Sequence, residues 1–252
     1  MAQISGLVIT LNEEANIEAC LASMWPVCSE IVVVDSHSTD GTVAIAEAAG
    51  ATVYRQAYLG DGPQRSYGLK YCGNDWVLNL DADERLETDA VRCIQSIDLS
   101  QSTCTAYELR RKNILHGKWI KVAGWYPDYV RRLFNRRSAD FSPVYMHTKI
   151  VTQRVEKLDG HIVHYSFGGY ADMIRTLNSY SDWLSRGIIE KGRPVYALKP
   201  FIHGFLSFVK HYVIKRGFAA GLDGLVISIL NACGSFFKYA KAIEHYRRSG
   251  ND

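Results

Sequence analysis

The first hundred residues alternate between short, continuous apolar segments and segments with a helical period, and each apolar segment ends near a polar residue. Continuous apolar runs are typical of strands in a parallel sheet, because crossover helices cover both of its faces. We therefore predict an α/β fold with a mostly parallel sheet and helices on both faces. The predicted strands are residues 6–10, 31–34, 51–54 and 76–80, and the predicted helices are residues 13–24, 40–49 and 64–71.

After residue 100 the pattern changes to strand-like segments joined by longer loops, at residues 106–114, 130–134, 149–155 and 161–165. From residue 170 the period is helical to the end of the chain. We predict one domain over residues 1–168, with a ligand-binding half at 1–100 and a second half at 101–168. A helical region that is rich in basic and aromatic residues follows at residues 169–252.

The net charge of +3 is too small for a dedicated nucleic-acid binder with a basic face, so no nucleic-acid partner is expected. The charge is concentrated at one end, because residues 199–252 contain eight Lys and Arg against three acidic residues. The six cysteines show neither metal-binding nor disulfide spacing. We find no leader-like N-terminal segment and no uncharged run of the ~20 residues that a spanning helix needs. These features predict a cytoplasmic protein without a transmembrane segment.

Asp81 and Asp83 flank a single alanine directly after the fourth predicted strand. Two carboxylates in this position can point into one cavity and hold a divalent ion. Mg²⁺ or Mn²⁺ takes hard oxygen ligands, a few from protein and the rest from phosphate and water. Such an ion stabilises the negative charge that grows on a departing diphosphate. Taken alone, the same residues also fit an acidic turn that Glu84 and Glu87 extend into solvent.

Further polar residues follow the other predicted strands, and ligands of such sheets bind at the carboxyl ends of the strands. Asp35 can accept a hydrogen bond from the N3–H of a uracil ring, or it can serve as a turn residue. Thr10, Asn12 and Glu13 open the first helix, where they cap it or line a ribose and base pocket. Arg65 follows a glycine-rich turn and can grip phosphate with its planar fork, or lie in solvent. No dinucleotide or P-loop glycine motif is present.

Three motifs, in this order, resemble the signature of glycosyltransferase family 2. They are Ile9-Thr10-Leu11-Asn12-Glu13-Glu14 with Asn16-Ile17, Val34-Asp35-Ser36 with Ser38-Thr39-Asp40, and Leu80-Asp81-Ala82-Asp83-Glu84. The resemblance implies a GT-A fold, a nucleotide-sugar donor, Mg²⁺ or Mn²⁺, and inversion of the anomeric carbon. Within the acidic motif we assign Asp83 to the metal, and Asp81 to the metal or to the ribose.

A second resemblance spans nearly the whole chain, to bacterial glucosyltransferases of the lipopolysaccharide inner core. It is carried by Gln64-Arg65, Gly124-Trp125-Tyr126-Pro127-Asp128, Arg132-Leu133-Phe134, Gly217-Phe218 with Gly221, Asp223-Gly224 and Lys238-Tyr239-Ala240. Those enzymes add β-1,4-linked glucose to heptose. The resemblance implies transfer of a hexose, with glucose the first candidate, from a UDP-sugar to a lipid-linked saccharide.

An inverting transfer needs one catalytic base. Asp128 is the first candidate, because an acid in an aromatic loop that contains proline can be desolvated and hence more basic. Pairing of Asp128 with Arg131 or Arg132 is the alternative. His147 is the second candidate, although it is followed by Thr148 where similar enzymes commonly carry Glu, which leaves the acceptor open. Trp125 and Tyr126 are candidates for stacking on the acceptor sugar, or for packing in a core.

The C-terminal region interleaves aromatic side chains with Lys and Arg, as an interfacial helix on an anionic inner leaflet requires. A basic helix packed on its own domain is the alternative. We expect a protein that is peripheral on the inner face of the cytoplasmic membrane. Two other functions fit the same sequence: a transferase of this fold that glycosylates a protein side chain, and an inactive glycan-binding or scaffold protein at the membrane.

Overall fold

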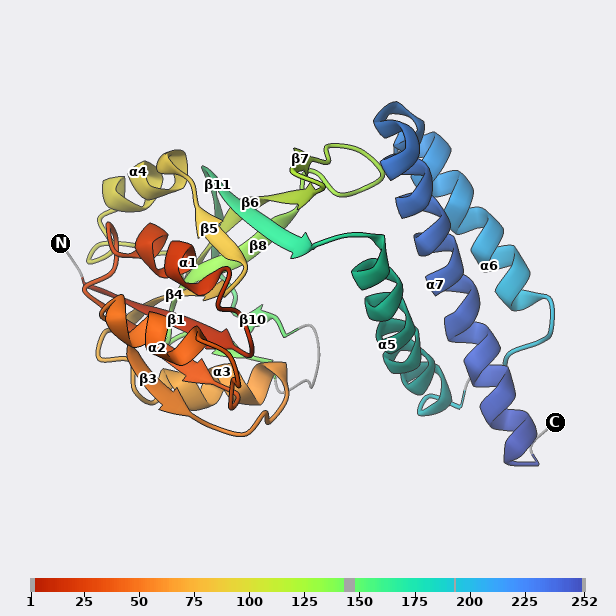
Figure 1. The fold of residues 1–252 in the computed structure, drawn as a ribbon, viewed down its shortest axis with the longest axis horizontal. Helices are drawn as coiled ribbons and strands as arrows, with labels where there is room; N and C mark the ends of the chain where they lie inside the picture. The colour runs from red at the N-terminus through yellow and green to blue at the C-terminus, as the bar shows by residue number, and fades with distance from the viewer. Residues whose placement is uncertain (1–2, 143–147, 193, 251–252) are drawn as a thin grey trace. The chain divides into compact units, whose positions relative to one another are not determined.

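The computed structural model describes residues 3–142, 148–192 and 194–250. The chain divides into two compact units, shown in Figure 1. The first unit comprises Met1–Lys112 and Asp128–Tyr165, and the second comprises Asn113–Pro127 and Ser166–Asp252. The predicted division after residue 168 lies three residues from the third passage between the units, which follows Tyr165, but it placed residues 113–127 in the first domain. The structure groups that segment with the C-terminal helices instead.

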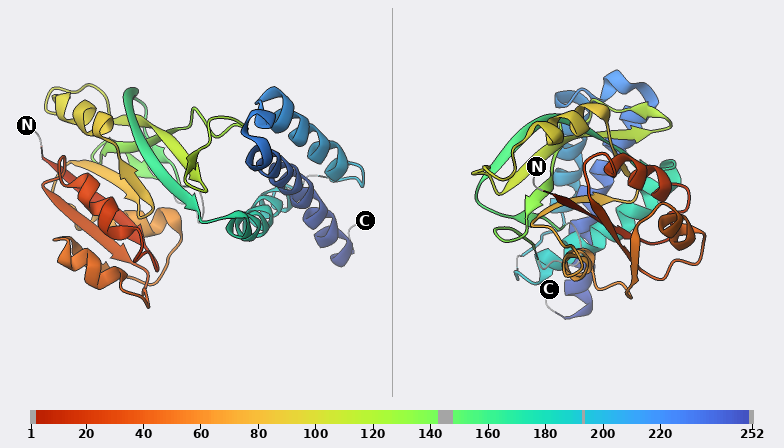
Figure 2. Two further views of the ribbon diagram at one scale, coloured as in Figure 1. Left: turned by 45° about the horizontal axis from the view of Figure 1, so that its top comes forward. Right: turned by 90° about the vertical axis from the view of Figure 1, so that its left-hand side faces the viewer.

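A single twisted sheet organises the first unit (Figures 1 and 2). Along the described chain the strand order is β3-β2-β1-β4-β8-β6-β11-β5, and β7 pairs with β6. The strands are β1 Ile4–Thr10, β2 Glu30–Asp35, β3 Thr52–Arg55, β4 Trp76–Asp81, β5 Glu84–Leu86, β6 Ala106–Leu115, β7 Lys118–Trp119, β8 Tyr129–Asn135 and β11 Val155–Phe167. A separate pair is formed by β9 Asp140–Phe141 and β10 Ile150–Val151.

The sheet has two halves that differ in strand direction. The strands β3, β2, β1 and β4 are parallel, so their carboxyl ends share one edge. Beyond β4 the pairs β4–β8, β8–β6 and β11–β5 are antiparallel. The parallel half therefore gathers Thr10, Asp35 and Asp81, which end β1, β2 and β4, at a common edge.

Helices cover both faces of the sheet, as predicted. One core cluster joins β1, β2 and β4 to α1 Ile17–Met24, α2 Thr42–Ala48 and α4 Thr88–Ser96. A second cluster lies on the other face and contains Leu7, Val34 and Val77, with α3 Asp61–Leu69 packed on it. The helix α3 lies close to the sheet at Gly68. A Cβ at this position would lie only 2.5 Å from Leu7 Cδ1 and 2.7 Å from Val34 Cγ2, so the close packing requires glycine. The predicted α/β fold is confirmed.

The second unit is helical apart from residues 113–127, the hairpin tip, which contains the end of β6 and the strand β7. It contains α5 Tyr170–Ile189, α6 Lys199–Phe208, a π-helical turn η1 Val209–Ile214, a 3-10 turn η2 Gly217–Ala220 and α7 Gly221–Arg248. A small core joins Leu115, Ile120 and Ala123 of the hairpin tip to Met173 of α5 and Ile227 of α7. The hairpin tip at residues 113–127 therefore belongs to the hydrophobic core of the helical unit.

The segment Gly217–Arg248 contains a stretch that is apolar and long enough to cross a membrane, judged by length and composition alone. Only 17% of that stretch is buried inside the protein. The sequence analysis considered only uncharged runs, whereas isolated charges such as Lys238 do not interrupt the helix. The absence of a transmembrane segment stays a prediction.

Candidate active site

A hollow of about 390 Å³, which we call the edge hollow, lies at the carboxyl edge of the parallel strands. Its lining residues come from the ends of β1 and β4, from the segments that follow β1, β2, β3 and β4, and from α3 and β11. They include five residues predicted from the sequence: Thr10, Glu13, Arg65, Asp81 and Asp83. A volume of this size lies within the range of small-molecule sites. Residues far apart in the sequence thus meet where ligands of α/β sheets bind.

Two other predicted residues support the wall of this hollow. Asp35 is fully buried, and its two carboxylate oxygens accept hydrogen bonds from the backbone N–H of Ser38 at 3.0 Å and from its hydroxyl at 2.5 Å. Asn12 has a positive φ of 54°, and its Oδ1 accepts from the Thr39 N–H at 2.8 Å. The contact between Asn12 and Thr39 joins the loop after β1 to the loop after β2.

Asp81 is held between two buried arginines. Its Oδ1 lies 2.5 Å from Nη2 of Arg65, and its Oδ2 lies 2.6 Å from Nη2 of Arg132. Burial alone raises the pKa of Asp81, but Arg132 and Arg65 outweigh this effect and hold the pKa well below its usual range. Both carboxylate oxygens are therefore engaged by guanidinium groups, which makes Asp81 a positioning group for the two arginines.

Glu84 continues this network into the interior of the protein. Its side chain is fully buried, and one carboxylate oxygen accepts from Arg132 and, at 3.4 Å, from Arg111. The other oxygen accepts from the backbone N–H of Asp81 at 3.1 Å. The sequence-based alternative, in which Glu84 extends an acidic turn into solvent, is wrong. The Glu84 carboxylate is buried, and Arg132 and Arg111 compensate its negative charge.

Asp83 lies beside an imidazole that the sequence analysis did not single out. Its Oδ2 is 3.3 Å from Nε2 of His164, which lies on β11. Both residues line the hollow. One carboxylate oxygen and one imidazole nitrogen at this spacing can approach the same divalent ion, and an imidazole ligand suits Mn²⁺ better than Mg²⁺. These donors fit a metal more readily than Asp81, whose oxygens are occupied by arginines.

A second hollow of about 410 Å³ shares Arg65 and Asp81 with the first. Its lining is rich in charged side chains, and the cations outnumber the carboxylates: they are Arg65, Arg111, Arg131, Arg132 and Lys149 against Asp61, Asp81 and Glu108. Within the part of the chain that the structure describes, Nδ2 of Asn79 and Nε of Arg132 are buried donors without a hydrogen-bond partner. The same holds for the hydroxyl of Thr10 in the first hollow. Buried unpartnered polar groups cost free energy, which a bound polar ligand can recover.

The two candidate bases have different outcomes. Oδ2 of Asp128 accepts from Arg111 at 2.9 Å (Nε) and lies 2.8 Å from Nη2 of the same side chain. Sequence reasoning offered Arg131 and Arg132 as the pairing partners, and the structure supplies Arg111. His147 lies outside the described residues. The catalytic assignments of Asp128 and His147 stay predictions.

The predicted acceptor residues belong to the second unit. Trp125 packs near Phe167, with 6.1 Å between ring centroids, and Tyr126 meets Trp119 edge-on at 4.9 Å. Trp125 contacts the small core of that unit, as the packing alternative proposed. A role of either residue in binding an acceptor stays a prediction.

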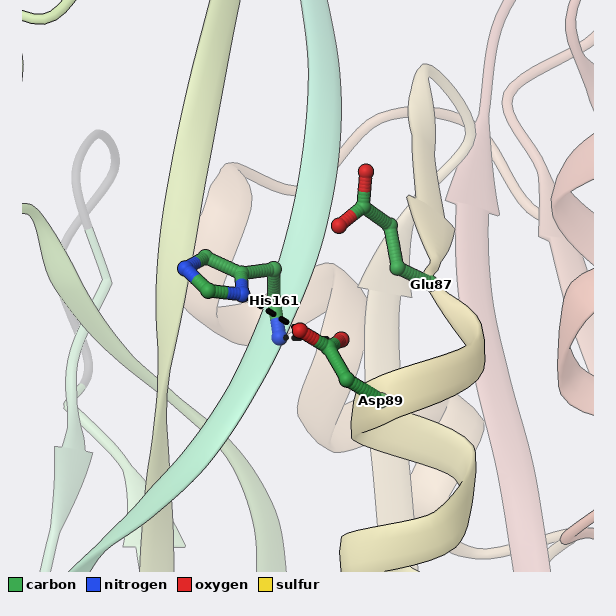
Figure 3. Close-up of side chains that lie close together, drawn as sticks. All are labelled: Glu87, Asp89 and His161. Carbon is green, nitrogen blue, oxygen red and sulfur yellow. Dashed lines mark hydrogen bonds and ion pairs between the residues drawn. The ribbon is translucent and has the colours of Figure 1, made fainter.

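Among the described residues, one group of three His and carboxylate side chains brings its ligand atoms within 4.8 Å of one another: Glu87, Asp89 and His161. Figure 3 shows Asp89, at the start of α4, joined to His161 on β11. The Nδ1 of His161 lies 2.6 Å from Asp89 Oδ2, and Glu87 forms an ion pair with Lys112. These atoms already have partners, so the group links α4 to β11.

Sequence reasoning missed three residues of the site: Glu84, Arg132 as the partner of Asp81, and His164. A signal existed for Arg132, because it is a charged residue in the middle of the strand β8, directly before the apolar residues Leu133 and Phe134. No comparable signal marked His164, because β11 reaches the hollow only through the antiparallel half of the sheet.

The family described as Glycosyl transferase family 2 matches residues 5–216, and the chain belongs to this family. An uncharacterized glycosyltransferase of Rickettsia felis is 32% identical over 100% of this chain and 93% of its own length. The lipopolysaccharide core biosynthesis glycosyltransferase LpsC of Rhizobium meliloti is 26% identical over 96% of this chain and 93% of its own length. The chain is therefore a glycosyltransferase enzyme.

Solved structures of low sequence identity also align with the chain. Glucosyl-3-phosphoglycerate synthase from Mycobacterium tuberculosis, solved in complex with Mn²⁺, UDP and glucosyl-3-phosphoglycerate, is 20% identical, with a TM-score of 0.49 over 77% of this chain and 81% of its own. TarS 1-349 of S. aureus is 15% identical, with a TM-score of 0.48 over 98% and 92%.

Proposed function

We propose that this enzyme is an inverting transferase that moves a hexose, glucose in the first instance, from a UDP-sugar to a lipid-linked saccharide such as a heptose of the lipopolysaccharide inner core. The observation that carries the proposal is the edge hollow, which unites Thr10, Glu13, Arg65, Asp81 and Asp83. The relative named for lipopolysaccharide core biosynthesis supports the proposed acceptor class.

The donor nucleotide is assigned to the hollow at the ends of β1 and β4. Thr10 offers a buried hydroxyl to the ribose or base, and Arg65 offers a guanidinium to phosphate. Burial raises the pKa of Glu13, while a hydrogen bond from Asn16 opposes this effect. Glu13 is therefore an acceptor for ribose hydroxyls that loses its charge at a higher pH than an exposed glutamate.

A divalent ion, Mn²⁺ or Mg²⁺, is assigned to Asp83 and His164. When bound, it would offset the negative charge that develops on the leaving diphosphate. The chain's own contribution is to fix the surrounding cations, because Asp81 orients Arg65 and Arg132 through both of its oxygens. Preorganised charges of this kind need no rearrangement when the bond to the sugar breaks.

The sugar and the acceptor are assigned to the adjoining hollow of about 410 Å³, where Nδ2 of Asn79 and Nε of Arg132 have no partner among the described residues. The helical unit is assigned to the membrane surface on which a lipid-linked acceptor lies. Its large apolar side chains support this placement, since Phe201, Phe205, Ile214 and Leu222 are all more than 60% exposed.

The test is a donor screen with purified full-length protein. UDP-glucose, UDP-galactose and UDP-N-acetylglucosamine are incubated with Mn²⁺ or Mg²⁺, and release of UDP is measured. We expect metal-dependent hydrolysis of one donor, with UDP-glucose preferred. A protein that neither binds nor hydrolyses any UDP-sugar in the presence of Mn²⁺ contradicts the proposal. Mass analysis of the glycolipid from a strain that lacks the protein then identifies the acceptor, as a core shortened by one hexose.

A further inference from the structure

The second unit contains a hollow of about 580 Å³ that the proposed transfer does not use. Its walls are two segments, residues 121–127 of the hairpin tip and residues 214–219 between η1 and α7. Three cationic side chains line it, Lys121, Lys215 and Arg216, together with Tyr126 and Ile214. None of the described residues that line it is acidic. We call it the basic hollow.

The three cations of the basic hollow have no carboxylate partner within ion-pair distance among the described residues, whereas Lys241 and Arg248 of the same unit are paired with Asp182 and Glu244. The ammonium group of Lys121 lies 4.1 Å from the ring centroid of Trp119, which is a cation–π contact and adds no negative charge. Like charges gathered in one concavity raise the local concentration of anions. The arrangement is suited to an anionic ligand.

The backbone holds the two walls of the basic hollow together. The Ala123 N–H donates to the Lys215 carbonyl at 2.9 Å. Ala123 and Arg216 both adopt the left-handed region, with φ of 55° and 56°, which residues other than glycine rarely do. A Cβ at Gly124 would lie 2.6 Å from the Lys215 ammonium nitrogen, so glycine leaves room for this cation. The positions of Lys215 and Arg216 are thus set by a defined turn.

Apolar side chains surround the basic positions in the same segment. Val213, Ile214, Phe218 and Leu222 are exposed by 54%, 72%, 51% and 68%, respectively. The unit as a whole has 14 Lys and Arg against 6 Asp and Glu, a net charge of +8, which leaves −5 for the rest of the chain. Exposed apolar side chains around a basic site are what a protein needs at the surface of an anionic bilayer, where they reach the acyl boundary. A phosphate compound in solution would leave them in water.

We propose that the basic hollow binds the phosphate group of an anionic phospholipid headgroup, while Ile214, Phe218 and their apolar neighbours enter the adjacent acyl boundary. The ligand class is a phosphate diester at a bilayer surface. The inference rests on the proposed function only in placing the acceptor at a membrane, and it adds a defined headgroup site to what would otherwise be diffuse electrostatic attraction.

The test compares two double variants of the full-length protein that remove the same charge. Lys215→Ala with Arg216→Gly empties the hollow of two cations, and glycine also tolerates the left-handed backbone at residue 216. Lys199→Ala with Lys210→Ala removes two exposed or half-exposed cations of the same unit that do not line the hollow. Binding is measured by co-sedimentation with phosphatidylcholine vesicles that contain roughly 30 mol% phosphatidylglycerol, because anionic lipid gives the surface a negative potential that attracts basic residues.

Each surface charge contributes about the same to diffuse attraction, so the control variant measures the loss of attraction alone. We expect the hollow variant to bind at least about tenfold more weakly than the control variant, because it also loses the headgroup site. Equal losses in the two variants would overturn the proposal in favour of diffuse attraction. Glycerol 1-phosphate is the soluble probe: if it competes with vesicles at millimolar concentration and Ile214→Ser has no effect on vesicle binding, the site takes soluble phosphate and the lipid assignment fails.

Two controls separate failure of this proposal from other failures. Lys121→Gln, on the other wall, provides a second variant if the double substitution lowers the unfolding temperature, and we expect it to weaken vesicle binding as well. Hydrolysis of UDP-glucose without membranes is measured for every variant and is expected to stay unchanged. Absence of hydrolysis in the unmodified protein would count against the proposed function alone, since the vesicle assay does not depend on it.

Discussion

Each unit of this glycosyltransferase contains a group of cationic side chains, and the two groups differ in their burial and in their carboxylate partners. In the first, Arg65 and Arg132 are buried and shared between Asp81, Asp61 and Glu84. In the second, Lys121, Lys215 and Arg216 are exposed and have no carboxylate partner in the described chain. Buried charges must be compensated within the protein, because desolvation penalises an isolated ion. Exposed charges can be left for a partner.

The difference indicates which substitutions affect folding and which affect binding. Removal of a buried cation in the first unit leaves its carboxylates without compensation, so stability falls. Removal of an exposed cation in the second unit relieves repulsion, so stability changes little while attraction to an anionic surface is lost.

We predict that Arg132→Met lowers the free energy of unfolding by about 3–5 kcal/mol, because Asp81 and the fully buried Glu84 lose their shared partner. Urea denaturation followed by circular dichroism measures the effect. Arg137→Met is the matched control: its side chain is 76% exposed and pairs with Asp75, so a loss below about 1 kcal/mol is expected. Equal losses in the two variants would show that the buried network does not behave as a unit.

Asp83→Asn is expected to reduce UDP-sugar hydrolysis more than about 100-fold, since a bound divalent ion contributes several kcal/mol of charge stabilisation in such reactions. The urea midpoint should stay near that of the unmodified protein, because Asp83 is not part of the arginine network. His164→Gln should shift the Mn²⁺ requirement to higher concentration. Asp98→Asn, in an exposed loop, serves as control, and full activity of Asp83→Asn would refute the metal assignment.

The parallel half of the site could be predicted from sequence because its residues follow directly from strand ends. Thr10 and Asp81 end apolar strands, and strands with continuous apolar runs pair in parallel with their carboxyl ends together. The hollow therefore contains most of the predicted donor residues. The orientation of a side chain could not be predicted in this way. Asp35 also lies at a strand end, but its buried carboxylate binds Ser38.

The antiparallel half could not be predicted at this level. His164 reaches Asp83 only because β11 pairs with β5 beside the acidic turn, with His164 in register with Glu84. Such register depends on long-range strand pairing, which the periodicity of one segment does not encode. The helical unit shows the same limit, since the packing of residues 113–127 against α5 and α7 joins segments more than forty residues apart.

Lys241 of the second unit differs from the cations of the basic hollow because it is paired and largely buried, so its removal should lower stability. Its ammonium donates to the Asn178 carbonyl at 3.0 Å and the Ser181 hydroxyl at 2.8 Å, and it lies 2.6 Å from Asp182. These contacts join α7 to α5, and bonds from a charged donor contribute about 1–2 kcal/mol when partly exposed. We expect Lys241→Ala to lower the unfolding free energy by that amount in urea titrations, against less than about 0.5 kcal/mol for Arg248→Ala in its exposed pair with Glu244.

The smallest effect is expected for the half-exposed pair of Asp89 and His161. Burial raises the pKa of Asp89, but hydrogen bonds from the His161 side chain and backbone outweigh this, and the folded-state pKa lies below 3.8. A depressed pKa means that the contribution to stability is present above the unfolded value near 3.8 and disappears as the pH falls through the folded value. The Asp89 side chain is 42% exposed, so the contribution is below about 1 kcal/mol.

Unfolding free energies of the unmodified protein and of Asp89→Asn, measured between pH 6 and pH 3, test this prediction. The difference between the two should be constant down to about pH 4 and should shrink below it, because only the aspartate loses a favourable charge there. Asp81 provides the internal contrast: Arg132 and Arg65 keep it ionised to lower pH, so the arginine network should persist where the Asp89 contribution has gone. A difference that grows on acidification would mean that Asp89 is destabilised by its surroundings, and the distinction between strongly and weakly compensated charges within the first unit would fail.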